Sequence, residues 1–137
     1  MTTQPKDTVQ EGPGAVAPAA LAPREPVQFD TRPLVRLFAE RGETAAEEAV
    51  CTRLEEISLR LRRLERAFAS HDLARIALSA ERLGELAGAI GLTSVRAVAR
   101  HVAEAARSGD GAALAATLAR LTRVTDRSLA EIWDLED

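Results

Sequence analysis

The residues that could do chemistry in this chain are few, and the most prominent are two carboxylates. Glu81 and Glu85 stand four residues apart, a spacing that places both on one face of a helix. Metal sites in helical bundles need acidic or His ligands that project inward from several helices, and the inward positions predicted below are Leu, Ala, Val and Ile. We therefore expect no metal, no cofactor and no enzymatic activity.

The other reactive side chains are two His and one Cys. His71 lies at a predicted helix start, His101 at the edge of a buried helical face, and Cys51 inside a helix. They form no Cys/His cluster, and the sequence has no Gly-rich phosphate loop. A single Cys cannot form an internal disulfide, so a reducing cytosol is the natural compartment.

Composition favours a helical protein. The 137 residues are 46% hydrophobic but only 3% aromatic, so Ala and Leu must fill the core, as in closely packed helices. The net charge of -3 predicts no attraction to nucleic acid. No apolar run approaches the ~20 residues of a membrane span, and the N-terminus lacks a signal-peptide pattern. We expect a cytoplasmic protein that does not bind membranes.

Helix signals divide the chain into a tail and one domain. Residues 1–29 hold five of the six prolines and are predicted to be disordered, whereas residues 30–137 are predicted to be helical. Asp30 is the expected N-cap of a first helix over 31–40, which Gly42 ends. Thr44 and Glu47 form a capping box for a second helix that runs to about Ser70. Its apolar seam repeats at intervals of four and three residues: Val50, Leu54, Ile57, Leu61, Leu64 and Phe68.

Three more helices follow. Asp72 is expected to cap the third, which runs to about Ile90 and ends at Gly91. A fourth starts at Thr93 or Ser94, and Asp110 caps the last. The expected inward residues are Leu73, Ile76, Ala80, Leu83, Ala87 and Ile90, then Val95, Val98, Ala99, Val102 and Ala105, then Leu114, Leu118, Leu121, Val124, Leu129 and Ile132. Polar Thr125 and Ser128 should fall outside this last stripe, and Trp133 should plug one end of the bundle. Because the connections are short, we predict an all-α, antiparallel up-down four-helix bundle with a short N-terminal helix across one end.

The outward face of the third helix is unusually small and apolar. Glu81 should be exposed, surrounded by small or apolar residues where Lys, Glu and Arg are usual. This pattern indicates a face for docking another protein, extended by arginines of the second helix: Ala74, Ala77, Leu78, Glu81, Gly84, Glu85, Gly88, Arg60 and Arg63. The alternatives are that Ala is simply a good helix former and that the arginines are a solvated face. Gly84 and Gly88 could also serve close helix packing.

Residues 81–91, Glu-Arg-Leu-Gly-Glu-Leu-Ala-Gly-Ala-Ile-Gly, resemble the signature of the histidine-containing phosphotransfer (Hpt) family, His-x-Leu-Lys-Gly-Ser/Ala-Ala-x-x-Leu/Ile-Gly. The matching positions are Leu83, Ala87, Ile90 and Gly91. Asp72, nine residues before Glu81, and the Ser-Gly-Asp-Gly turn at 108–111 are also typical of the family. The resemblance covers about 31–135 and implies the same bundle.

The departures from the signature fall at the positions that serve phosphotransfer in the family. Glu81 replaces the phospho-accepting His, Gly84 the Lys and Glu85 the Gly, while Leu86 replaces Ser/Ala. A carboxylate cannot form the phosphoramidate that the relay uses. The resemblance therefore implies a non-catalytic Hpt-like module of two-component phosphorelay signalling, which docks a receiver domain or a histidine kinase as adaptor or inhibitor. Two alternatives stay open: active phosphotransfer through His101 or His71, and a structural protein that forms a homodimer through its third helix.

Overall fold

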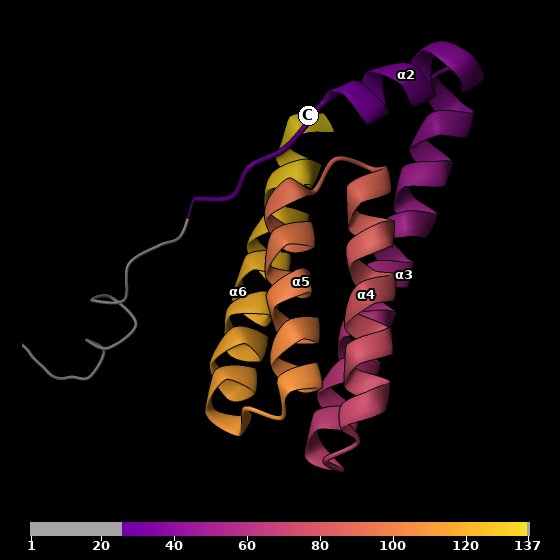
Figure 1. The fold of residues 1–137 in the computed structure, drawn as a ribbon. Helices are drawn as coiled ribbons and strands as arrows, with labels where there is room; N and C mark the ends of the chain where they lie inside the picture. Colours follow the sequence, from indigo (N-terminus) through magenta and orange to yellow (C-terminus); the bar gives the residue numbers. More distant parts are fainter. Residues whose placement is uncertain (1–25, 137) are drawn as a thin grey trace, which may run out of the picture.

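The structure, a computed structural model, describes residues 26–136, and these residues form five helices and no strand. The all-α prediction is confirmed. The helices, labelled as in Figure 1, are α2 (Arg32–Arg41), α3 (Glu43–Ala69), α4 (Leu73–Ala89), α5 (Thr93–Ser108) and α6 (Gly111–Glu136). Residues 1–25, most of the predicted disordered tail, lie outside the described range. None of the described helices has the length and apolarity that crossing a membrane requires.

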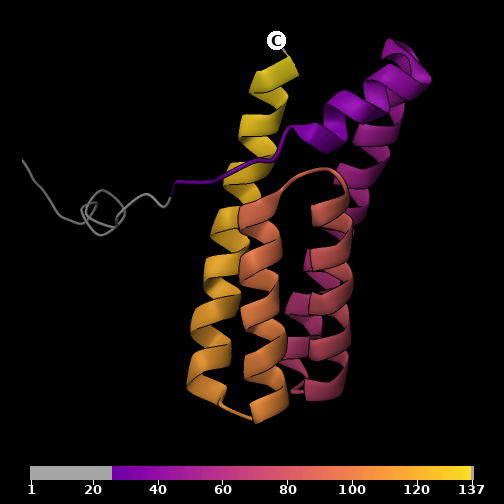
Figure 2. The same cartoon turned by 45° about the horizontal axis from the view of Figure 1, so that its top comes forward.

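The four long helices run up and down beside one another, and α2 lies across the end where α3 begins (Figures 1 and 2). Consecutive helices make the extensive contacts, above all α4 with α5, as expected of an up-down bundle with short connections. The two outer helices, α3 and α6, approach each other much less closely. The α4–α5 pair is thus the most tightly associated part of the bundle.

The seam predicted for α3 is the core of the bundle. Five of its six residues are buried, and Phe68 packs half-buried against the same cluster: Val50, Leu54, Ile57, Leu61 and Leu64. The predicted capping box is wrong. Gly42, whose φ of 84° ends α2, is already the N-cap of α3, so Thr44 lies inside the first turn and makes no cap. A glycine in this conformation lets one helix follow another without a linker.

The caps predicted for α4 and α6 are confirmed. The Asp72 carboxylate accepts a hydrogen bond from the Arg75 amide, and the Asp110 carboxylate accepts one from the Ala113 amide. Asp30 lies one residue too early to be the N-cap of α2, which is Thr31, although its carboxylate does accept the amide of Arg32. Side-chain oxygens thus fix the start of three helices.

Residues 26–30 form an N-terminal arm that packs on the α4–α5 loop, so the predicted tail boundary at residue 29 is too late. The Asp30 amide donates to the Gly91 carbonyl at 2.8 Å, and the Gln28 amide donates to the Ser94 hydroxyl at 2.8 Å. Gly91 has a φ of +83°, and a Cβ built on it would lie 1.9 Å from the Asp30 carbonyl oxygen. The arm therefore requires glycine at this position.

The predicted drift of the α6 stripe is wrong in part. Val124 and Ile132 are buried as predicted, but Thr125 and Ser128 are also fully buried, at 0% exposure. The heptad spacing therefore continues to the end of the helix, in the way typical of a supercoiled bundle. Neither hydroxyl has a hydrogen-bond partner among the described residues. A buried hydroxyl without a partner costs stability.

Trp133 does not plug the bundle, because it is 46% exposed. Apolar side chains of the arm and of α2 pack against the core instead: Val27, Phe29, Leu34, Leu37 and Phe38. The first two lie in the segment that was predicted to be a disordered tail, so this covering of the core was not expected.

Candidate functional site: a groove between α4 and α5

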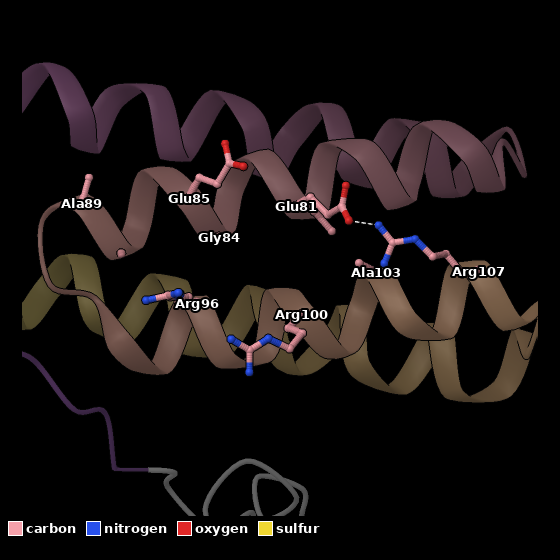
Figure 3. A pocket seen from close by; sticks show the side chains of 10 residues that line it. Glu81, Gly84, Glu85, Ala89, Arg96, Arg100, Ala103 and Arg107 are labelled. Carbon is pink, nitrogen blue, oxygen red and sulfur yellow. Dashed lines mark ion pairs between the residues drawn. The ribbon is translucent and has the colours of Figure 1, made fainter.

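A groove of about 610 Å³ runs between α4 and α5 on the outside of the bundle (Figure 3). Carboxylates and glycines of α4 form one wall, and arginines of α5 form the other. The charged and glycine residues that line it are Glu81, Gly84, Glu85 and Gly88 from α4, and Arg96, Arg100 and Arg107 from α5. Position 81, where the Hpt signature has its His, is therefore part of this groove.

Small residues explain why α4 and α5 lie so close beneath the groove. Gly84 is buried, and a Cβ on it would lie 3.5 Å from the Ala99 Cβ, at ordinary van der Waals distance. At Gly88 the same construction would meet the Arg96 side chain at 3.0 Å, so this side chain lies directly over the glycine. Helix backbones approach closely where such residues face each other. Gly84 thus lies in the close α4–α5 contact, one of the alternatives open from the sequence, whereas Gly88 leaves room for the Arg96 side chain.

The predicted docking face divides into two strips. Ala74, Leu78, Glu81 and Glu85 are exposed, and Leu78 is the most exposed large apolar residue of the described chain, at 68%. Of the other three, Ala77 and Gly84 are buried and Gly88 is half-buried, and both glycines lie against residues of α5. The expectation that they are open to a partner is wrong, because α5 covers that side of the helix.

Glu81 makes an ion pair across the groove with Arg107 of α5. Both side chains are about half exposed, at 46% and 50%, so the pair contributes little to stability. Its effect is on orientation: the carboxylate turns toward α5 rather than outward (Figure 3). Glu85 pairs with Arg82 of its own helix at 3.1 Å and points away from the arginines of α5.

Arg96 and Arg100 are the functional candidates that the sequence analysis missed. They occupy successive turns of α5, are exposed, and make no ion pair with any residue of the described chain (Figure 3). A signal was available, because Arg96, Arg100 and Arg107 are spaced by four and seven residues and so share one side of a helix. Only the buried face of this helix was considered from the sequence.

The arginines chosen from the sequence lie elsewhere. Arg60 is half-buried and Arg63 is exposed, both are on α3, and neither lines the groove. The positive charge next to the exposed surface of α4 therefore comes from arginines of α5. Periodicity placed Arg60 and Arg63 off the seam of their helix, but it could not tell which neighbour they face.

The two His lie outside the groove. His71 is exposed in the α3–α4 turn, with a φ of 58°, and His101 is exposed on α5. His71 directly precedes Asp72, the N-cap of α4, and so stands at the start of that helix as expected. Within residues 26–136 no three His, Cys, Asp or Glu side chains gather as a metal site would require.

Comparison of the chain with protein-family models, with curated proteins and with solved structures gives no match. The role of the groove is therefore inferred from its own geometry and from the resemblance of residues 81–91 to the Hpt signature.

Proposed function

We propose that this chain is a non-catalytic, Hpt-like docking module of two-component signalling, which binds a receiver domain or a histidine kinase without accepting phosphate. One observation carries the proposal: at the signature position of the phospho-accepting His stands Glu81, half-exposed on α4 and paired with Arg107 across the groove. This is the position from which a phosphotransfer protein would attack, and here it holds a carboxylate that is already engaged. The up-down helical bundle supports the proposal, since it is the architecture that the resemblance implies.

Two of the three other departures from the signature point the same way. The position of the family's Lys is Gly84, which is buried against α5 and has no side chain to approach a phosphoryl group. In the family, a Gly one turn after the His gives a receiver room to reach that His. Here the exposed and charged Glu85 stands at this position. A partner that docks here meets a face altered in charge and shape at each position that phosphotransfer uses.

The exposed strip of α4 offers the contact. Leu78 projects from it beside the groove, and an isolated apolar side chain of this exposure is a candidate anchor for a partner. Of the two partner classes, the arginines of α5 favour the receiver domain, since its phosphoaspartate is anionic and these arginines line the same groove as position 81.

Binding of receiver domains to two charge variants tests the proposal. Leu78→Arg places a bulky cation in the middle of the proposed contact. It should weaken binding about five- to thirtyfold, which corresponds to losing a central apolar anchor of about 1–2 kcal/mol. Leu59→Arg is the matched control, because Leu59 is also an exposed leucine, at 40%, but lies on α3. Titration calorimetry with receiver domains from the same cell measures both. Equal affinity of Leu78→Arg and the wild-type chain would exclude this surface.

The homodimer alternative has less support. The small residues through which a second copy could approach closely, Ala77 and Gly84, are buried within the bundle. The part of the face that remains open carries Glu81 and Glu85, and a two-fold axis through it could bring these like charges together.

A further inference from the structure

We propose that Arg96 and Arg100 form a binding site for a dianionic phosphoryl group in the groove between α4 and α5. The site is distinct from position 81. If the ligand is a small molecule, the site does not depend on the proposed docking function. If the phosphoryl group is carried by a partner protein, the inference rests on that proposed function.

Two features of α5 concentrate positive charge in the groove. Arg96 and Arg100 stand at i and i+4 of α5, which places their Cβ atoms about 5–6 Å apart, and like charges at this spacing repel. Arg96 is the fourth residue of α5, and the first turn of that helix has no acidic residue to offset the positive end of the helix dipole. An anion bound between the two guanidinium groups would relieve both effects.

The local carboxylates do not neutralise this charge. Glu81 is paired with Arg107, and Glu85 is paired with Arg82 of its own helix and points away from the arginines of α5 (Figure 3). Arg96 and Arg100 therefore make no ion pair with any residue of the described chain, and they line a groove with room for a small ligand. Gly88 contributes that room, since the Arg96 side chain lies over it where a larger residue would displace it.

The charge and geometry of the two side chains favour a phosphoryl group over a single carboxylate. A phosphomonoester carries close to two negative charges at neutral pH and offers three acceptor oxygens. Two arginine forks can each bind a pair of such oxygens, and together they match the charge of the dianion.

Phenyl phosphate is the probe that tests the site, titrated into the full chain and followed by amide and guanidinium NMR shifts. We expect saturable binding at millimolar concentrations, with shifts centred on α5 and α4. The double variant Arg96→Gln/Arg100→Gln should bind at least tenfold more weakly, since hydrogen bonds to charged groups are lost. The control, Arg62→Gln/Arg63→Gln, makes the same change in net charge on the exposed face of α3 and should bind as the wild-type chain does.

Three results would overturn the site: no saturation, equal weakening by the control variant, or equal affinity for benzoate. Receiver domains then distinguish the source of the phosphoryl group. If the phosphoryl group is carried by a receiver, the phosphorylated receiver should bind more tightly than the unphosphorylated one. The variant Arg96→Gln/Arg100→Gln should then abolish this difference. Phenyl phosphate binding without any receiver binding would keep the site and reject the docking function, so the two proposals fail separately.

Discussion

Replacing Gly91 with Ala measures how much the N-terminal arm contributes to the bundle. Gly91 has a φ of +83°, and a non-glycine residue in the left-handed region costs about 1–2 kcal/mol. An added Cβ would also lie 1.9 Å from the Asp30 carbonyl oxygen, a backbone atom that can only move with the arm. The variant therefore has to displace the arm as well as strain its own backbone.

The contacts of the arm set the size of the second effect. Displacement breaks the 2.8 Å hydrogen bond from the Asp30 amide to the Gly91 carbonyl, worth about 0.5–1.5 kcal/mol net. It also exposes Val27 and Phe29, which are half-buried on the core, at a cost of about 1 kcal/mol or more. The whole substitution should lower the free energy of unfolding by about 3–4 kcal/mol.

Gly109→Ala is the matched control, since Gly109 has a φ of +73° but nothing lies within 4 Å of its added Cβ. It should cost only the backbone strain, about 1–2 kcal/mol. Urea unfolding followed by circular dichroism measures both variants. Hydrogen exchange should show the Asp30 amide protected in the wild-type chain and in Gly109→Ala but not in Gly91→Ala. Equal losses of stability in the two variants would refute the reasoning, because the arm would then contribute nothing.

Two further predictions concern stability. Thr125→Val replaces a fully buried hydroxyl that has no partner among the described residues. It should raise the free energy of unfolding by about 1 kcal/mol, seen as a higher urea midpoint. A lower midpoint would mean that the hydroxyl does have a partner. Arg32 hydrogen-bonds to Asp30 and lowers the pKa of that carboxyl from 3.8 to about 2. The ionised carboxylate therefore stabilises the fold above pH 3.8, and this contribution disappears as the pH falls toward 2. Asp30→Asn should therefore be less stable than the wild-type chain at neutral pH and equal to it below about pH 2 in acid titrations; a difference that does not change with pH would contradict this.

The parts of the fold that the sequence predicted are those set by local rules. The 4-3-4 spacing of α3 identified its buried residues, and Asp72 and Asp110 identified the starts of α4 and α6, because each signal depends on a few neighbouring residues. The burial of Thr125 and Ser128 was missed because residue polarity was given more weight than the spacing. The spacing decided the outcome, since the rigid helix brings those positions to the core whatever their polarity.

The candidate site was harder to predict because it belongs to two helices. Glu81 was correctly expected to be exposed, but no rule for a single helix shows that α5 covers Gly84 or that Arg107 reaches Glu81. The arm was missed for a similar reason: its hydrogen bonds to Ser94 and Gly91 join residues more than sixty positions apart. Contacts of this range follow from tertiary packing, which periodicity does not encode.

The central claim, that position 81 has kept its place on a docking face but lost its phosphotransfer chemistry, is tested most directly by transfer from phosphorylated receiver domains. Wild-type chain and the variant Glu81→His/Glu85→Ala are incubated with the receivers of the same cell, and acid-labile label on each is counted. We predict no label on the wild-type chain, an unchanged phosphate lifetime on the receivers, and label on the variant, whose imidazole occupies the exposed position. Label on the wild-type chain would contradict the claim and direct attention to His101 or His71, and a folded variant without label would show that the groove is not an Hpt-like docking face.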